Sequence, residues 1–238
     1  MARANTAGMS TGGDLTSSVE LVYQRTRRAI LTGDYPPGSP LRLQELAATN
    51  GVSMIPVREA LRLLEAEGFV DTIPNRGARV APLSMEDLRD VYRTRIVLED
   101  EALRQAFPRI TRAHLVKARR LNARLVNQFA RHGYATYDDH RAFHFLLYEP
   151  SGSRWLLRLI GIVWDHTERY RRQGAPLVAG ELAGEEHERI IAAVERGTID
   201  DACQALRDHL ATSSDVIAQA LARAGIDGKS PPEARANF

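Results

Sequence analysis

The chain has 238 residues, 44% of them hydrophobic, and a formal net charge of +2. This length and apolar content allow one or two domains with a real core. A charge so close to neutral does not itself indicate a nucleic-acid partner, so any such attraction must come from the placement of individual side chains. The single cysteine, Cys203, excludes an internal disulfide and fits a reducing compartment.

Both ends of the chain have the composition of poorly ordered segments. Residues 1–16 are small and polar without an apolar centre, and residues 227–238 include Lys-Ser-Pro-Pro. No stretch resembles a signal peptide or a membrane span, because the most apolar helix, Trp155 to Trp164, is interrupted by Arg158. We therefore expect a soluble, cytoplasmic protein.

The stretch from Pro36 to Val80 predicts two short helices, a tight turn, a longer helix and a small hairpin, the order of a winged helix-turn-helix. Gly51 can close the helix before the turn in a left-handed conformation. Ser53 can cap the next helix, and Pro56 fits in its first turn, where no N–H is required. The second helix of such a unit enters the major groove of DNA. The alternative is a helical hairpin of a larger core, with its arginines facing solvent.

The second helix of this unit has two different faces. Three-and-four spacing predicts a buried face, made of Val57, Ala60, Leu61 and Leu64. The opposite face carries Met54, Arg58 and Arg62, and Arg58 is placed to reach a phosphate or a guanine edge. In the hairpin that follows, Asn-Arg-Gly lies between short apolar runs, so we expect Arg76 and Gly77 at the tip of the wing.

The strings AILTGDYPPG, LQELA, GVSMIPVREALRLLEAEGFV and PNRGARV follow one another between Val19 and Leu83. They resemble the DNA-binding domain of the GntR family of bacterial transcription regulators. The family commonly has arginine and threonine where this chain has Met54 and Ile55, so its usual operator does not carry over, and these apolar side chains could contact a thymine methyl. The candidate DNA contacts are Ser53, Met54, Ile55, Arg58, Arg62, Arg76 and Gly77.

From Ser84 onward the pattern is helical almost throughout, with no convincing strand. Ser84 and Asp87 resemble a capping box that opens the first helix. Five more helices are predicted, near residues 112–131, 137–149, 153–171, 184–195 and 199–224. The fold class is therefore mainly α. A winged helix-turn-helix over residues 17–82 precedes an all-α antiparallel bundle over residues 83–226.

Four of the seven histidines are expected at one height of this bundle. His140 and His144 lie four residues apart on one helix and hence on one face. His187 precedes the turn at Gly197 by ten residues and His209 follows it by twelve, so at about 1.5 Å per residue both lie roughly 15–18 Å from the turn. Neutral imidazoles suit a divalent transition metal such as zinc or nickel, and an anion such as a carboxylate would complete its shell. The alternative is that these are separate polar groups lining a cavity or surface.

The strings HRAFH and EHERIIAAVERGTIDDACQALRDHL resemble the ligand-sensing FCD domain of the FadR-type branch of the same family, over residues 86–222. The resemblance implies a metal site in which His144, His187 and His209 correspond to the family's three histidines. His140 stands where the family has aspartate. An imidazole can still coordinate there, but it removes one negative charge from the site.

Arg95 and Glu99 match a further motif of that domain, in which the arginine faces the effector pocket. Arg95 could hold an effector carboxylate as a bidentate fork, or it could form an ion pair with Glu99 four residues on. Arg169 is a second candidate effector contact, and Trp164 and Arg172 could line the same pocket.

These resemblances imply a homodimeric transcription regulator, not an enzyme, that binds a palindromic operator in double-stranded DNA. Its operator binding would respond to a small organic acid bound at the metal site. One alternative is a metal-ion sensor, in which the ion itself is the effector. A remote alternative is a metal-dependent hydrolase, which needs a general base beside the metal, whereas Arg141 stands where a zinc protease has glutamate.

Overall fold

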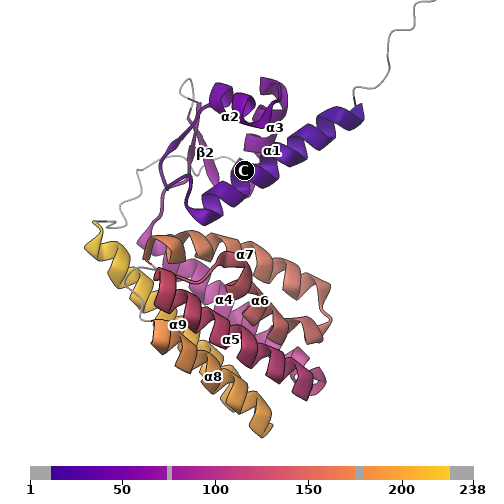
Figure 1. The fold of residues 1–238 in the computed structure, drawn as a ribbon, viewed down its shortest axis with the longest axis vertical. Helices are drawn as coiled ribbons and strands as arrows, with labels where there is room; N and C mark the ends of the chain where they lie inside the picture. Colours follow the sequence, from indigo (N-terminus) through magenta and orange to yellow (C-terminus); the bar gives the residue numbers. More distant parts are fainter. Residues whose placement is uncertain (1–11, 74–76, 175–179, 226–238) are drawn as a thin grey trace, which may run out of the picture. The chain divides into compact units, whose positions relative to one another are not determined.

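The computed structural model describes residues 12–73, 77–174 and 180–225 (Figure 1). The chain divides into two compact units, Met1–Pro82 and Leu83–Phe238. The first unit contains α1 (Gly12–Thr32), β1 (Pro40–Leu41), α2 (Leu43–Asn50), α3 (Met54–Ala66), β2 (Val70–Ile73) and β3 (Gly77–Val80). This order of elements confirms a winged helix-turn-helix.

Helix α1 is an element of the first unit that was not predicted from the sequence. It packs along α3 and buries Val22, Thr26 and Ile30, which recur every fourth residue. This spacing is the helical signal that the sequence offered. The helix begins at Gly12, inside the segment that we expected to be poorly ordered; residues 1–11 lie outside the described part of the chain.

The turn between α2 and α3 forms as predicted. Gly51 adopts a left-handed conformation, with φ of 67°, and its N–H bonds the carbonyls of the preceding turn. The expected buried face of α3 is confirmed, and Pro56 lies buried in the first turn of the helix. The role of Ser53 is a correction: it occupies the capping position in an extended conformation, but its side chain makes no capping hydrogen bond within the described residues.

Between Pro36 and this turn the chain forms one short helix, α2, where two were predicted. The stretch before it forms a turn and the two-residue strand β1. Pro36, Pro37 and Pro40 lack the N–H that a helix needs, and Gly38 has φ of 79°. Backbone chemistry therefore favours a turn and an edge strand there.

The wing is a three-stranded sheet with the order β1-β3-β2. Strands β2 and β3 form the predicted hairpin, in the antiparallel register that pairs Val70 with Val80 and Ile73 with Gly77. The Arg79 guanidinium lies 3.3 Å from the Asp71 carboxylate across the hairpin. Residues 74–76, and with them the predicted tip residue Arg76, lie outside the described part of the chain.

The second unit is a bundle of helices, as predicted (Figure 1). It contains α4 (Met85–Ala106), η1 (Phe107–Arg109), α5 (Arg112–His132), α6 (Tyr137–Tyr148), η2 (Glu149–Ser151), α7 (Arg154–Gly174), α8 (Gly180–Arg196) and α9 (Ile199–Arg223). Ser84 caps α4 by accepting from the backbone N–H of Asp87 at 3.1 Å. Among the described helices none is long and apolar enough to cross a membrane.

Helix α8 begins before Gly184, which we had taken as its first residue. That glycine is needed inside the helix because α8 packs closely on α5. A Cβ added at Gly184 would lie 2.4 Å from a methyl group of Val126. The missing side chain therefore permits the close approach of the two helices, and it does not mark a helix end.

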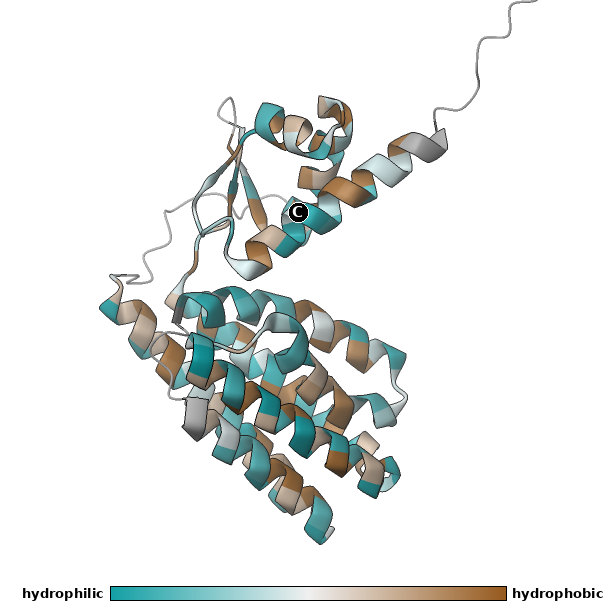
Figure 2. Ribbon diagram, viewed as in Figure 1, coloured by the Kyte–Doolittle hydropathy of each residue, from teal (hydrophilic) through white to brown (hydrophobic). Residues whose placement is uncertain are grey.

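Hydrophobic and hydrophilic residues alternate along the helices at the front of the bundle (Figure 2). The apolar faces build one core, with Leu88, Leu103, Leu125, Phe143, Leu147, Trp164, Ile190 and Leu206 among its members. Charged groups are buried with them, including Arg95, which is 3% exposed, and Glu99, which is fully enclosed. Charged side chains are seldom fully buried unless they are paired, and these two form an ion pair with each other.

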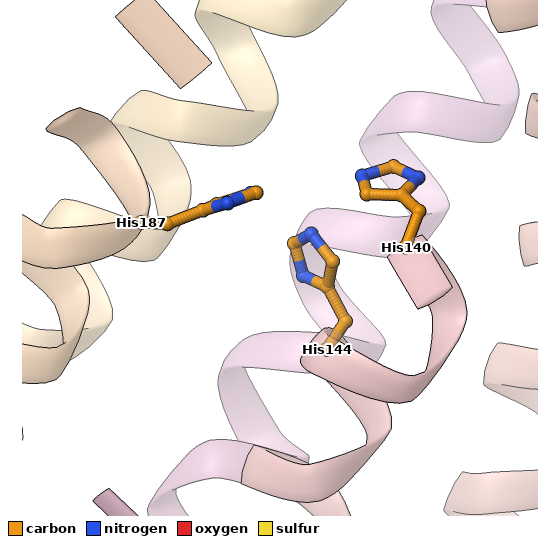
Figure 3. Close-up of side chains that lie close together, drawn as sticks. All are labelled: His140, His144 and His187. Carbon is orange, nitrogen blue, oxygen red and sulfur yellow. The ribbon is translucent and has the colours of Figure 1, made fainter. Parts of the chain in front are cut away.

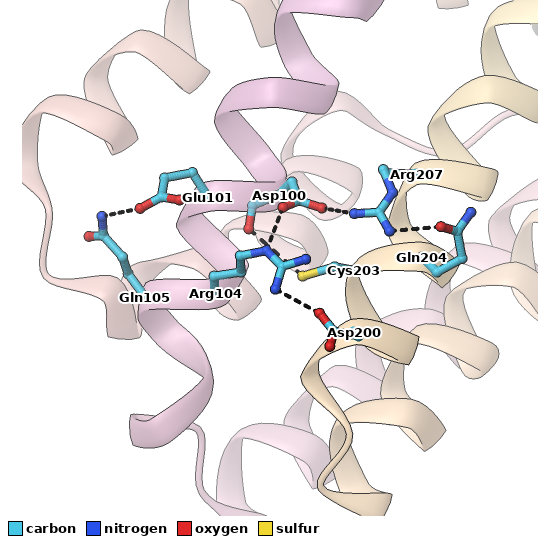
Figure 4. A network of polar contacts seen from close by, with 8 residues as sticks. All are labelled: Asp100, Glu101, Arg104, Gln105, Asp200, Cys203, Gln204 and Arg207. Carbon is cyan, nitrogen blue, oxygen red and sulfur yellow. Dashed lines mark hydrogen bonds and ion pairs between the residues drawn. The ribbon is translucent and has the colours of Figure 1, made fainter.

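Helices α4 and α9 are joined by a polar network around Asp100 (Figure 4). The Asp100 carboxylate accepts from Arg104 at 2.8 Å and also from Arg207, and Arg104 reaches Asp200 at 2.9 Å. The fully buried Cys203 lies beneath this network. Burial, and next the charge of Asp100, raise the pKa of its thiol to about 11.

The folded protein should therefore resist thiol reagents. Near pH 8, Cys203 is an enclosed neutral thiol, whereas the reactive form is the thiolate. Ellman's reagent should react slowly with the folded chain, and one thiol per chain should react rapidly after unfolding in guanidinium chloride. Fast stoichiometric reaction of the folded chain would contradict this placement of Cys203.

Candidate metal centre and DNA-reading helix

Three histidines of the bundle point toward one another (Figure 3). His140 and His144 lie one turn apart on α6, and His187 lies on α8. Each offers a ring nitrogen, and these three nitrogens lie within 4.8 Å of one another. The ring centroid of His144 lies 5.0 Å from that of His140 and 5.1 Å from that of His187. The structure thus brings together three of the four histidines that the sequence predicted to be ligands.

Each of the three rings also has a nitrogen without a hydrogen-bond partner in the described part of the chain. Among the described residues, His140 Nδ1, His144 Nε2 and His187 Nε2 are buried without a hydrogen-bond partner. Leaving a buried polar group unsatisfied costs about 1–3 kcal/mol. A metal ion would accept a lone pair from each of the converging nitrogens, since neutral imidazole is a good ligand for divalent transition metals. These residues therefore fit a metal.

The electrostatics of the cluster keep the imidazoles neutral. Burial lowers the pKa of His144 and His187 well below the ordinary value, and neighbouring histidines lower both further. The pKa of the partly buried His140 is also lowered, by desolvation first and then by the charge of Arg171. Neutral imidazole is the form that coordinates a metal, so no proton has to be displaced from these rings near neutral pH.

His209 takes a different place from the one predicted. Its ring lies 4.6 Å from that of His187 and 5.3 Å from that of His144, so the estimate of its height in the bundle was right. Its nitrogens, however, are not among the three that converge. His209 Nδ1 lies 2.9 Å from the carboxylate of Glu186, the residue before His187 on α8.

Polar side chains also contact the Nδ1 atoms of the candidate ligands His144 and His187. The Tyr148 hydroxyl lies 3.3 Å from His144 Nδ1 and donates to Glu99 at 2.5 Å. Asn122 Oδ1 lies 3.0 Å from His187 Nδ1. The sequence reading missed Tyr148 and Asn122. Tyr148 carried a usable signal because it follows His144 by four residues, whereas Asn122 carried none.

Arg95 forms the ion pair that was one of its two predicted roles, with Nε 2.5 Å from the Glu99 carboxylate. Its guanidinium also lies 4.5 Å from the centroid of the Trp164 ring. That ring in turn lies 4.9 Å from both His140 and His144. Arg95 is therefore separated from the histidine cluster by a single aromatic side chain.

The other candidate effector contacts lie on the same helix as Trp164. Arg169 is 4% exposed, while the guanidinium of Arg172 lies 4.1 Å from the ring of Tyr134. The indole Nε1 of Trp164 is buried without a partner among the described residues. It is a hydrogen-bond donor close to the histidines that an acceptor could satisfy.

In the first unit, the predicted DNA contacts of α3 are all exposed, namely Ser53, Met54, Ile55, Arg58 and Arg62. Met54 is 44% and Ile55 is 62% exposed, which is high for large apolar side chains. Arg62 lies 2.7 Å from Glu59. Gly77 is exposed at the start of β3, with φ of 88°. The first turns of α3 thus present apolar groups and an arginine together.

Comparison with known proteins agrees with these two units. The model of the bacterial regulatory proteins of the gntR family matches residues 19–80, and the FCD domain model matches residues 90–212. An uncharacterized HTH-type transcriptional regulator, BphR of Paraburkholderia xenovorans, is 33% identical and covers 87% of each chain. The HTH-type transcriptional repressor GlaR of Escherichia coli is 27% identical, over 84% of this chain and 96% of its own.

A solved structure with a similar fold is the putative transcriptional regulator GntR from Rhodococcus sp. RHA1. It has a TM-score of 0.72 at 24% identity, and covers 84% of this chain and 97% of its own. These matches confirm the family and the fold class predicted from the sequence, and they set aside the hydrolase alternative. The chain therefore belongs to the GntR family and is a DNA-binding transcriptional regulator with an N-terminal helix-turn-helix domain and a C-terminal FCD domain.

Proposed function

We propose that this regulator binds a palindromic operator as a homodimer, and that a small organic acid bound beside a metal ion in the FCD domain changes its affinity for DNA. Residues 17–82 would contact DNA, and residues 83–226 would sense the acid and dimerise. The observation that carries the proposal is the convergence of one ring nitrogen each from the partly buried His140 and the buried His144 and His187.

His140, His144 and His187 would hold the ion, with zinc or nickel as the preferred metals because imidazole nitrogen is a borderline ligand. All three ligands are neutral, so a divalent ion keeps its full charge and attracts an anion. No carboxylate of the described chain belongs to the converging group, and the nearby Asp139 is paired with Arg124 at 2.9 Å. A carboxylate from a small molecule would supply the missing negative charge.

Two buried donors favour an acid at this place. Arg95 uses Nε and Nη2 on Glu99, and no hydrogen bond of its Nη1 occurs within the described residues. Trp164 Nε1 also lacks a partner there. A carboxylate that accepted from both groups would satisfy them, and hydrogen bonds between charged groups are about twice as strong as neutral ones. Arg169, buried on the helix of Trp164, is a further candidate contact.

On the DNA side, α3 would lie in the major groove with its first turns toward the bases. Arg58 would bind a phosphate or the edge of a guanine, and Met54 and Ile55 would contact thymine methyl groups. Two copies of α3 related by a two-fold axis would require an operator with the same symmetry. Binding or release of the acid would shift the population between two arrangements of the dimer.

A metal-ion sensor is the second candidate function. It is favoured by the fact that a metal alone would bind the three converging nitrogens of His140, His144 and His187. In that case the ion would be the effector, and Arg95 would serve only its ion pair with Glu99. The two candidates differ in whether metal without acid alters operator binding.

The Arg58→Ala variant should bind the operator more weakly and keep its metal content. Loss of one specific base or phosphate contact costs about 1–3 kcal/mol, which is roughly a five- to 150-fold loss of affinity. Fluorescence anisotropy with a labelled operator would measure it. Arg131→Ala, at an exposed arginine of α5, is the control; equal affinity of both variants would remove Arg58 from the DNA-reading surface.

The His144→Ala variant should lose metal and still bind DNA. His144 is fully buried and offers one of the three ligand nitrogens, so its loss leaves two. Elemental analysis of the purified variant, with operator binding as the check of folding, makes the measurement. His132→Ala is the matched control because His132 is exposed at the end of α5. Unchanged metal stoichiometry in His144→Ala would exclude it as a ligand.

Removing the metal and restoring it should separate the two candidate functions. We expect that protein dialysed against a chelator and reloaded with metal keeps its operator affinity, and that the affinity changes only when an organic acid is then added. Anisotropy titrations with metal alone, acid alone and both together give the comparison. A full response to metal alone would instead establish the ion as the effector.

A further inference from the structure

We infer that Tyr148 and Asn122 act as positioning residues, which fix the proton of His144 and His187 on Nδ1 and so turn the lone pair of Nε2 toward the cluster. We further infer that the chain from Arg95 through Glu99 and Tyr148 joins the acid-binding arginine to a metal ligand. The role in metal binding rests on the proposed function, whereas the position of the protons does not.

The tautomer of His144 depends on the single proton of the Tyr148 hydroxyl. The Tyr148 hydroxyl donates to Glu99 at 2.5 Å. Glu99 is ion-paired with Arg95 in a place where both are almost completely enclosed, and a carboxylate can only accept. The Tyr148 oxygen therefore faces His144 Nδ1, at 3.3 Å, as an acceptor. The ring proton must then lie on Nδ1, which leaves the unpartnered Nε2 with its lone pair.

The tautomer of His187 depends on the side-chain amide of Asn122. Asn122 Nδ2 donates to the carbonyl of Gly184 at 2.8 Å. The reversed amide would place two acceptors against each other, so this bond fixes the orientation of the side chain. Oδ1 consequently faces His187 Nδ1, at 3.0 Å, as an acceptor. His187 too must carry its proton on Nδ1 and keep Nε2 free.

The fold supports this second contact directly. Asn122 reaches the Gly184 carbonyl because α5 and α8 approach closely at that glycine, where a Cβ would lie 2.4 Å from Val126. The absent side chain thus serves the orientation of a histidine three residues later on the same helix. Partners that orient a ligand histidine in this way typically account for a 10–100-fold difference in metal affinity.

The consequence for regulation comes from the Arg95 end of the chain. An acid that binds Arg95 contacts the residue that holds Glu99, and Glu99 holds the Tyr148 hydroxyl. If binding at one end changes the affinity at the other, the effect must be reciprocal. Any factor by which the acid changes the affinity for metal should therefore equal the factor by which the metal changes the affinity for the acid, and Tyr148 should be required for that coupling.

The protons can be observed without any metal. Nitrogen-15 NMR of metal-free protein labelled at histidine distinguishes the two neutral tautomers, with single His→Gln variants for assignment. We expect His144 and His187 in the Nδ1–H form in the wild type, and loss of that preference at His144 in Tyr148→Phe. Wild-type protein with the proton on Nε2 of these two residues would overturn the inference.

Metal affinity gives the second measurement, by zinc titration against a competing chelator. Tyr148→Phe should bind zinc about 10–100-fold more weakly, and Tyr170→Phe, at a buried tyrosine that donates to Asp87, should match the wild type. Asn122→Ala should also weaken zinc binding, with the exposed Asn127→Ala as its control, and it provides the test should Tyr148→Phe not fold. A wild type without zinc would refute the proposed metal site, whereas wild-type affinity in both variants would refute the positioning role.

Discussion

The stability of the helical unit depends on how the lost hydration of its buried polar groups is compensated. An enclosed ion pair such as Arg95 with Glu99 gains little net stability, because desolvation offsets most of the attraction. The neighbouring His144 and His187 avoid that cost by staying neutral, but the Nε2 of each remains unsatisfied among the described residues. An apolar bundle would be at least as stable, so the polar centre is better explained by a bound ligand than by the fold.

The local rules of the chain predicted most of the architecture. The turn at Gly51, the start of α3 at Met54 and the cap at Ser84 follow from backbone chemistry, which needs no tertiary contact. The features that were predicted wrongly or not at all depend on tertiary contacts. Strand β1 exists only because β3 offers it a partner, and Gly184 lies inside α8 because α5 packs against it. A glycine alone does not reveal whether it ends a helix or admits a neighbour.

The candidate site likewise contains some residues that could be placed from the sequence and others that only the packing of the helices places. His140 and His144 could be paired from their spacing, and His187 could be placed level with His209 from their distances to the turn at Gly197. The resemblance to the FCD domain put both beside His144. The partners that orient these rings could not be found from sequence spacing. Asn122 and His187 are separated by 65 residues, and no periodicity links them. Glu186 was adjacent to a predicted ligand, yet which histidine it would bind depended on the packing of α8 against α9.

The DNA-reading helix carries a related constraint. Where the family commonly has two polar residues, this chain exposes Met54 and Ile55, so fewer contacts can neutralise phosphates and more of the recognition falls on base methyl groups. Affinity that comes from counterion release is reduced on this surface, because one arginine fewer can neutralise a phosphate, and the net charge of +2 does not replace it. Each copy of α3 alone should then bind weakly, and the proposed dimer must engage both half-sites at once to hold its operator. A regulator built this way responds strongly to a small change in the spacing of its two reading helices, because losing one half-site loses nearly all of the binding.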